Sequence, residues 1–119
     1  MQAATKVSQR TATTASGENV AILSFTGDIA STSKDSIMEA YHGIDAGITN
    51  VLLDFTGVDY INSSGIAIII QMLLEAHTAG HRRIGIFGLT PHFMKVFNMV
   101  GVAKYATISA DETTAVAAV

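Results

Sequence analysis

Two adjacent serines, Ser63 and Ser64, are the side chains in this sequence whose type and setting could support chemistry. They follow a polar segment that begins at Thr56, and Gly65 comes directly after them. A serine oxygen can cap a helix by accepting a hydrogen bond from one of its first backbone N–H groups. An exposed serine can instead be phosphorylated, which adds about −1.5 to −2 charges. The pair therefore has two interpretations. Either one serine caps a helix and Gly65 only permits close packing, or one serine caps and the other is modified.

A phosphate on one of these serines would act on a binding surface rather than on the fold. The N-terminus of a helix tolerates an anion, with an interaction of about 0.3–1 kcal/mol that reaches ~2 kcal/mol when partly buried. A partner that covered the phosphate would have to desolvate a dianion close to Asp59. Such a cost could reach several kcal/mol, and each ~1.4 kcal/mol lowers affinity tenfold. Phosphorylation could therefore abolish association and leave the fold intact.

The remaining reactive residues give no catalytic or metal-binding pattern. His77 and His81 are four residues apart, but Gly80 lies between them and no acidic residue follows His77, so a solvated helix end is expected. The chain has no cysteine, which excludes disulfides and thiolate metal sites. Gly85-Ile86-Phe87-Gly88 is not a phosphate-binding loop, and no serine lies in a G-x-S-x-G motif. We expect no enzyme activity, no catalytic residue, no metal and no cofactor.

Composition limits the class of protein further. The chain has 119 residues, 49% of them hydrophobic and 14% charged, with a net charge of −3. The longest apolar stretch, Ile66 to Leu74, is interrupted by Gln71 and is far shorter than the ~20 residues that span a bilayer. The first residues contain no apolar region typical of a secretion signal. The basic residues are scattered except for Arg82-Arg83, whereas nucleic-acid binding needs a basic cluster. We expect a cytoplasmic protein with neither a membrane nor a nucleic-acid partner.

Continuous apolar runs indicate strands that are buried on both faces. They lie at 20–25, 51–55 and 83–89, with a shorter candidate at 106–108. Gly27 is expected to interrupt the first run, and a polar loop over 56–63 to follow the second. Residues 7–14 favour a β-strand and precede a turn at 16–19, which indicates a hairpin with the first run. We expect residues 1–16 to form an N-terminal arm or a first strand, and residues 17–119 to form a single domain.

Helices are predicted between these runs. Ile37, Tyr41, Ile44 and Ile48 lie on one helical stripe, which is expected to end near Gly43 to Gly47. Residues 64–79 are ambiguous because their β-branched residues favour a strand, but the length of the segment favours a buried helix. Thr90 and Pro91 predict the start of a third helix, and a capping-box pattern over 109–112 predicts a fourth. Alternating strands and helices predict an α/β fold with a mostly parallel sheet.

Several of these segments together resemble one family. Asp54…Ile61-Asn62-Ser63-Ser64-Gly65-Ile66 is similar to the D-L-S-x-V-x-x-M-D-S-S-G-L signature of bacterial STAS-domain anti-sigma-factor antagonists. Gly27-Asp28-Ile29 is similar to the family's G-E-L-D segment, and Phe97 to Val102 to its L-F-x-x-S/T-G-L segment. The resemblance covers roughly residues 20–108. It implies a STAS-like fold, with a mixed, mostly parallel, curved sheet of about four to five strands and about four helices.

The resemblance also implies a function and a site. Members of this family bind an anti-sigma factor that is a serine protein kinase, and this kinase uses ATP to phosphorylate one serine and release itself. The serine directly before the glycine is Ser64, with Ser63 as the second choice. A homodimer is a further candidate assembly. The implied partner-binding residues are Asp28, Asp59, Asn62, Ser63, Ser64 and Gly65.

Two positions differ from the family pattern and keep other functions open. Asn62 stands where an acidic residue usually precedes the serine pair, and Ala30 replaces the acid that closes the G-E-L-D segment. Both changes remove a carboxylate from the implied docking surface. One alternative is a constitutive STAS scaffold subunit of a larger signalling or lipid-transport complex, in which Ser64 is only a cap. Another is a nucleotide-binding or hydrolytic enzyme that uses Ser63 or Ser64.

Overall fold

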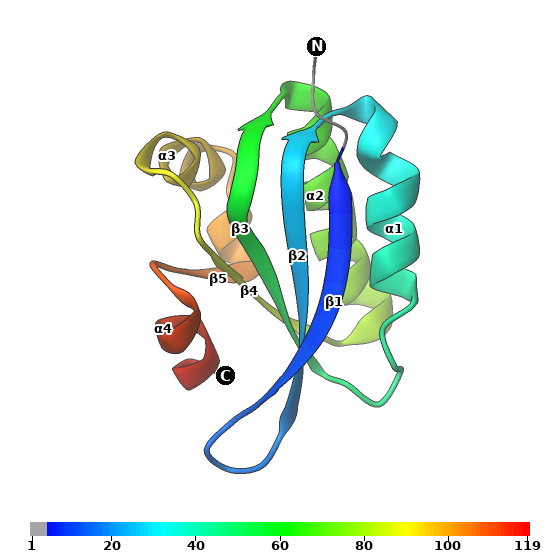
Figure 1. The fold of residues 1–119 in the computed structure, drawn as a ribbon, viewed down its shortest axis with the longest axis vertical. Helices are drawn as coiled ribbons and strands as arrows, with labels where there is room; N and C mark the ends of the chain where they lie inside the picture. The colour runs from blue at the N-terminus through cyan, green and yellow to red at the C-terminus, as the bar shows by residue number, and fades with distance from the viewer. Residues whose placement is uncertain (1–4) are drawn as a thin grey trace.

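Five strands form a single sheet in the computed structural model, which describes residues 5–119 (Figure 1). Their order in the sheet follows the sequence. The first two strands are antiparallel, and every later neighbour is parallel. This arrangement confirms the predicted α/β class and the mostly parallel sheet. The strands are β1 (Lys6–Thr13), β2 (Asn19–Ile29), β3 (Asn50–Ile61), β4 (Arg83–Phe87) and β5 (Ala106–Ser109).

Helices lie on both faces of the sheet. Three of them, α1, α2 and α3, contribute to the larger hydrophobic cluster, and α4 contributes to a smaller cluster on the opposite face (Figure 1). The helices are α1 (Lys34–His42), α2 (Ser63–Glu75), α3 (Pro91–Met99) and α4 (Glu112–Ala117), and the short helical segments are η1 (Ser31–Ser33), the π-helical η2 (Ala76–Gly80) and η3 (Val102–Lys104).

The two clusters explain the continuous apolar runs. Alternate residues of a strand point to opposite faces of the sheet. In β2, Leu23 and Phe25 pack in the larger cluster, whereas Val20 and Ile22 pack in the smaller one. Both sides of this strand are therefore buried, and the polar–apolar alternation of a half-exposed strand is absent.

Two sequence predictions about the strands are wrong. The polar loop predicted over 56–63 does not exist, because β3 continues to Ile61 and pairs there with the end of β2. Gly27 does not interrupt β2 but lies inside it with φ +85. The pairing of β2 with β3 shifts register on both sides of Gly27. The side chains of residues 56–61 are typical of a loop. Pairing with β2, with its shifts in register, nevertheless holds these residues in a strand.

Helix boundaries also differ in part from the sequence analysis. Helix α1 ends at His42, so Ile48 lies outside it. The segment predicted as a helix over 64–79 is helical, and its last turn is the π-helical η2. Burial of one face of α2, formed by Ile68, Ile69, Met72 and Leu73, overrides the strand preference of its β-branched residues.

The sequence predicted the N-terminal cap of α3 correctly and that of α4 incorrectly. Thr90 caps α3 as predicted, because its Oγ1 accepts the N–H of Phe93 at 3.2 Å. The predicted capping box is wrong: Ser109 is the last residue of β5, and Asp111 caps α4 by accepting the N–H of Thr114 at 2.9 Å. Across residues 5–119, no helix combines the length and the apolar character needed to cross a bilayer.

Candidate functional site

The implied binding residues meet where β2 and β3 end and α2 begins, at the upper end of the molecule in Figure 1. Asp28 pairs with Tyr60 in the sheet, and Ile29 pairs with Ile61. The backbone N–H of Asn62 then donates to the carbonyl oxygen of Ile29 at 3.1 Å. These contacts bring Asp28 next to the segment that carries the two serines, although more than thirty residues separate them in sequence.

Gly65 allows the first turn of α2 to approach β2. A Cβ at this position would lie 2.4 Å from the carbonyl oxygen of Ile29 and 2.9 Å from its carbonyl carbon. These are backbone atoms, which cannot move aside as a flexible side chain can. Gly65 is buried, so its part in the site is to hold α2 close to the strand end. The other five implied binding residues are at least partly exposed.

Asn62 caps α2. Its Oδ1 accepts a hydrogen bond from the backbone N–H of Gly65 at 2.8 Å. Both interpretations of the serine pair assumed that one serine is the cap, and that assumption is wrong. Ser63 and Ser64 are instead the first two residues of the helix, both exposed. Within residues 5–119, neither hydroxyl makes a hydrogen bond.

A small hydroxyl network supports the Asp28 side of the site. The carbonyl oxygen of Asp28 accepts a hydrogen bond from the hydroxyl of Thr5, which also bonds to Ser33 Oγ. The buried Ser33 Oγ accepts the backbone N–H of Ala30 at 3.0 Å. The turn after β2 is therefore held by backbone groups and Ser33. It does not need a carboxylate at position 30, so Ala30 leaves the scaffold intact.

Tyr60 is part of this surface and was missed by the sequence analysis. Its side chain is 51% exposed, beside Asp28 on the neighbouring strand. Its ring packs edge-on against Phe93 of α3, with 6.1 Å between centroids. An exposed aromatic residue next to a polar strand end is typical of protein interfaces. The signal in the sequence was an aromatic residue inside a supposed polar loop.

The site offers two hydroxyls at a helix N-terminus, two carboxylates and one aromatic ring. Asp28 and Asp59 supply the negative charge, whereas positions 30 and 62 are neutral. No histidine or carboxylate in the described part of the chain is hydrogen-bonded to either serine, so an activated nucleophile of the triad type is not assembled. Over the same residues, no group of three or more His, Cys, Asp or Glu side chains could hold a metal ion. This arrangement offers exposed hydroxyl, carboxylate and aromatic groups that another protein could contact.

Comparison with known proteins places this geometry in context. A family model described as STAS domain matches residues 11–115. An anti-sigma factor antagonist from Mycobacterium paratuberculosis has a similar structure, with a TM-score of 0.74 and 16% identity over 96% of this chain and 94% of that chain. No curated protein sequence matches.

Three further structures with this fold come from two different proteins. The anti-sigma factor antagonist SpoIIAA in its unphosphorylated form gives a TM-score of 0.62 at 14% identity, covering 92% of both chains. The phosphorylated form of the Bacillus SpoIIAA has a TM-score of 0.60 and 15% identity, covering 92% of this chain and 96% of that one. Part of the murine Slc26a9 anion transporter has a TM-score of 0.70 and 13% identity. The match covers 95% of this chain but only 21% of the transporter chain. At these identities the likeness concerns the fold.

Proposed function

The chain belongs to the STAS domain family, and on this premise we propose that it is a regulatory binding module whose partner is released by phosphorylation of Ser64. The partner would be an anti-sigma factor that is also a serine protein kinase. One observation carries the proposal: Asn62 caps α2, which leaves the adjacent serine hydroxyls exposed and without a structural role. In this proposal the chain acts by binding a partner and not by catalysis.

Ser64 is the preferred acceptor because it directly precedes Gly65, as the modified serine does in the family signature. Phosphorylation has a precedent in this fold, since SpoIIAA has a phosphorylated form. Ser63 is also exposed and lies one residue further from Gly65, so it is the natural control.

A phosphate on Ser64 would weaken binding through its charge. It would sit in the first turn of α2, where the backbone N–H groups favour an anion, so the helix would remain stable. A partner covering this turn would have to remove water from the dianion close to Asp28 and Asp59. Phosphorylation therefore acts on the complex and spares the fold.

The unmodified surface indicates the chemistry of its partner. Asp28 and Asp59 favour basic groups opposite them, and Tyr60 offers an aromatic ring that a partner can cover. With acids absent at positions 30 and 62, the partner needs fewer basic groups than one that binds the usual family pattern. We place this partner, together with the chain, in the bacterial cytoplasm.

A homodimer is a further candidate assembly. Measuring the mass of the chain in solution tests whether a second copy binds.

Labelling with ATP tests the assignment directly. The chain is incubated with ATP and the serine kinase that co-purifies with it, and the modified residue is located by mass spectrometry. Wild type and Ser63→Ala are expected to gain one phosphate at Ser64, whereas Ser64→Ala is expected to gain none. Equal labelling of Ser64→Ala, or no labelling by a kinase active on another substrate, would contradict the proposal.

A constitutive scaffold subunit is the second candidate. The likeness to part of a transporter and the missing carboxylates at positions 30 and 62 favour it. In that case the chain would remain in a stable complex whatever the state of Ser64. Co-purification of the same partners by wild type and Ser64→Asp, with no phosphate on the cellular protein, would support the scaffold function.

A further inference from the structure

The two edges of the sheet differ in how they are protected from pairing with another chain. An edge strand carries unpaired N–H and C=O groups, and proteins usually shield it with a short strand, a bulge, a proline or a charged side chain. At one edge, β5 has only four residues. At the other edge, β1 has eight residues without proline or glycine and pairs with β2 in an unbroken register. A further strand can therefore be added at β1.

The pairing of β1 shows which of its backbone groups face outward. Thr14, directly after β1, donates its backbone N–H to the carbonyl oxygen of Glu18 at 2.9 Å. In an antiparallel ladder, alternate residues direct both backbone groups toward the partner strand. Even-numbered residues of β1 therefore bond to β2, and odd-numbered residues face outward. The outward-facing set is uncharged and consists of Val7, Gln9, Thr11 and Thr13.

The arginine in the middle of β1 is turned away from the edge. Arg10 reaches across β2, so that its Nη2 lies 3.9 Å from Asp54 Oδ2 on β3. The same guanidinium donates to Glu112 of α4 at 2.9 Å. A charged side chain at an edge ordinarily prevents strand addition. Here two carboxylates hold that charge over the sheet, which leaves the edge beside it neutral.

A groove of about 660 Å³ runs along β1, between this strand and helix α1. In Figure 1, α1 lies to the right of β1. Odd-numbered side chains of β1 lie on the face of the sheet that α1 covers, because Val7 packs against the larger hydrophobic cluster. The lining from the helical side has short side chains or none, at Ser36, Ala40 and Gly43. A strand added to β1 would therefore place alternate side chains in this groove.

The groove also indicates the chemistry of the added strand. Val7 and Ala40 offer apolar contacts, which favour aliphatic side chains opposite them. Glu39 is the acidic residue in the lining, is exposed and forms no ion pair with any described residue. Its charge favours a lysine or arginine on the added strand.

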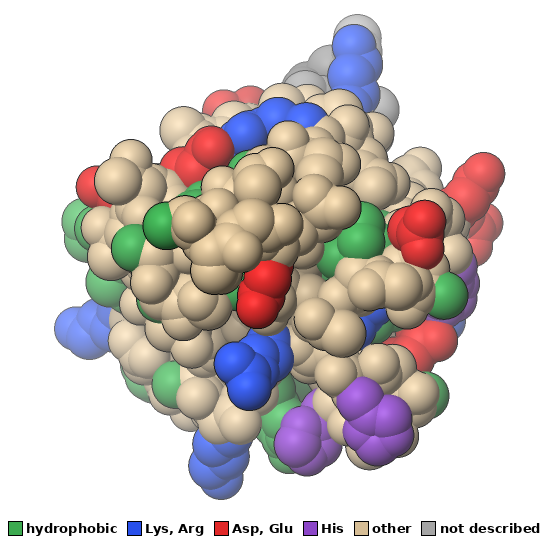
Figure 2. All heavy atoms as spheres, turned by 90° about the horizontal axis from the view of Figure 1, so that it is seen from below, with side chains coloured by type: hydrophobic (Ala, Val, Ile, Leu, Met, Phe, Trp, Pro, Cys, Tyr) green, Lys and Arg blue, Asp and Glu red, His purple; other side chains and the backbone are tan. Residues whose placement is uncertain are grey.

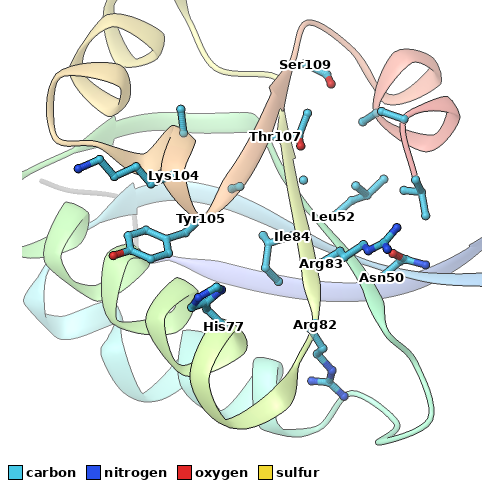
Figure 3. Close-up of a pocket in the computed structure, with 16 residues that line it drawn as sticks. Asn50, Leu52, His77, Arg82, Arg83, Ile84, Lys104, Tyr105, Thr107 and Ser109 are labelled. Carbon is cyan, nitrogen blue, oxygen red and sulfur yellow. The ribbon is translucent and has the colours of Figure 1, made fainter.

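The lower end of the sheet is less suited to a partner. A cleft of about 310 Å³ opens there, but the charged ends of Arg83 and Lys104 lie on opposite sides of β4 (Figure 3). One small ligand cannot meet both. Seen from below, hydrophobic side chains appear as separate small patches (Figure 2). The β1 edge, in contrast, combines unpaired backbone groups with a groove beside them.

We propose that β1 and its groove bind an extended segment of a partner protein as a sixth strand of the sheet. The segment exchanges main-chain hydrogen bonds with the odd-numbered residues of β1. Its alternate aliphatic side chains lie between β1 and α1, and a basic side chain lies opposite Glu39. Main-chain bonds supply affinity and the groove supplies sequence preference, as in other proteins that bind a peptide at a sheet edge. The site does not involve Ser63 or Ser64, so it is independent of the proposed function.

The peptide acetyl-Val-Thr-Ala-Thr-Arg-Thr-amide tests this inference in ¹⁵N-labelled protein. Saturable shifts are expected for the amides of Gln9, Thr11 and Ala40, and hydrogen exchange at Gln9 and Thr11 should slow by about tenfold or more at saturation. Two further versions carry N-methyl groups on the odd-numbered or the even-numbered peptide residues. One alternate set of N–H groups faces β1, so one version should bind about tenfold more weakly and the other within about threefold of the parent.

Variants of the chain locate the site. Gln9→Pro removes an outward N–H at a position where an edge strand accommodates proline, and it should bind about tenfold more weakly or less. The control Gln9→Ala keeps this N–H and should bind within about twofold of wild type. Glu39→Lys should weaken binding by about threefold or more, and a peptide with glutamate in place of arginine should reverse that loss. The Glu39→Lys arm does not depend on how proline affects the fold.

The outcomes decide the occupant of the edge. Equal binding of both N-methylated versions, or of Gln9→Pro and Gln9→Ala, would overturn strand addition. Slow exchange at the same amides without peptide, together with twice the mass in solution, would show that a second copy pairs at β1, which overturns the partner segment. No saturable shift with either charge on the peptide would overturn the site itself.

Discussion

The Oδ1 of Asn62 accepts a hydrogen bond from the backbone N–H of Gly65 at 2.8 Å, across the two serines that lie between them. One residue of this pair caps helix α2, and the other allows the helix to touch the end of β2. Neither serine is therefore needed to cap the helix or to hold it against the strand. Within four consecutive residues, Asn62 and Gly65 support the fold, and Ser64 is the proposed site of phosphorylation.

Removal of the cap should destabilise the protein. We expect Asn62→Ala to lower the free energy of unfolding by about 1 kcal/mol, because the N–H of Gly65 loses its acceptor. Asn62→Asp should retain the cap and gain up to about 1 kcal/mol from its charge at the helix N-terminus. Urea denaturation measures both changes.

The matched controls are Ser63→Ala and Ser64→Ala. Because neither serine caps the helix, each should change the free energy of unfolding by less than about 0.5 kcal/mol. A loss in either one as large as that of Asn62→Ala would show that the serine, and not Asn62, holds the helix end.

Gly65→Ala should lower the free energy of unfolding more than an ordinary glycine substitution does. The new Cβ would overlap the carbonyl group of Ile29, so α2 must move away from the strand, at a cost of about 1–3 kcal/mol. Gly47→Ala is the control, since its Cβ would meet only Asp45 Oδ1 at 3.4 Å. Thermal and urea unfolding compare the two. Equal stability of the two variants would contradict the close approach of α2 to β2.

Tyr60 should contribute to partner binding without supporting the fold. Truncation of an exposed interface tyrosine that a partner covers costs about 2 kcal/mol or more, or roughly thirtyfold in Kd. We expect Tyr60→Ala to show this loss with less than about 1 kcal/mol change in stability. Tyr105→Ala, which alters a 36% exposed tyrosine at the other end of the sheet, should bind normally. Equal affinities of the two variants for the partner would show that Tyr60 is not part of the binding surface.

One surface ion pair should make stability depend on pH. Arg10 of β1 binds Glu112 of α4 through two hydrogen bonds, one of them 2.9 Å long, and this lowers the pKa of the Glu112 carboxyl. A carboxyl whose pKa is lower in the folded state stabilises the fold above its ordinary pKa of about 4.3. That contribution is lost as pH falls below this value.

The Glu112→Gln variant measures this contribution. It should be less stable than wild type by under about 1 kcal/mol at pH 7, because the pair is exposed, and the difference should disappear near pH 3. High salt should reduce it as well. Glu39→Gln, in which an exposed glutamate of α1 is replaced, should show no such pH-dependent difference. A difference for Glu112→Gln that is constant from pH 7 to pH 3 would contradict the ion pair.

Sequence alone predicted the elements whose signals are local. The apolar runs of β2, β3 and β4 reflect burial on both faces, and Thr90-Pro91 marks the start of α3 because both residues act within one helical turn. The family segments also indicated that Asp28 and the serines belong to one surface, and the pairing of β2 with β3 brings them together.

The errors concern features that depend on a distant partner. The second half of β3 looks like a loop because its stability comes from pairing with β2 across an irregular register. Three polar residues, Asn62, Ser63 and Ser64, can each cap a helix. In the structure Asn62 does so, at the point where Gly65 lies against Ile29. Tyr60 was overlooked for the same reason, since its exposure depends on where α3 packs.

The central claim is that phosphorylation of Ser64 controls association and leaves the fold unchanged. Calorimetric titration of the partner kinase with unphosphorylated, Ser64-phosphorylated and Ser64→Ala protein tests it most directly. Phosphorylation should raise Kd by about 100-fold or more, equivalent to about 2.7 kcal/mol, whereas Ser64→Ala should bind within about threefold of wild type. A phosphorylated chain that unfolds at the same urea concentration as wild type but binds with the same Kd would contradict the claim.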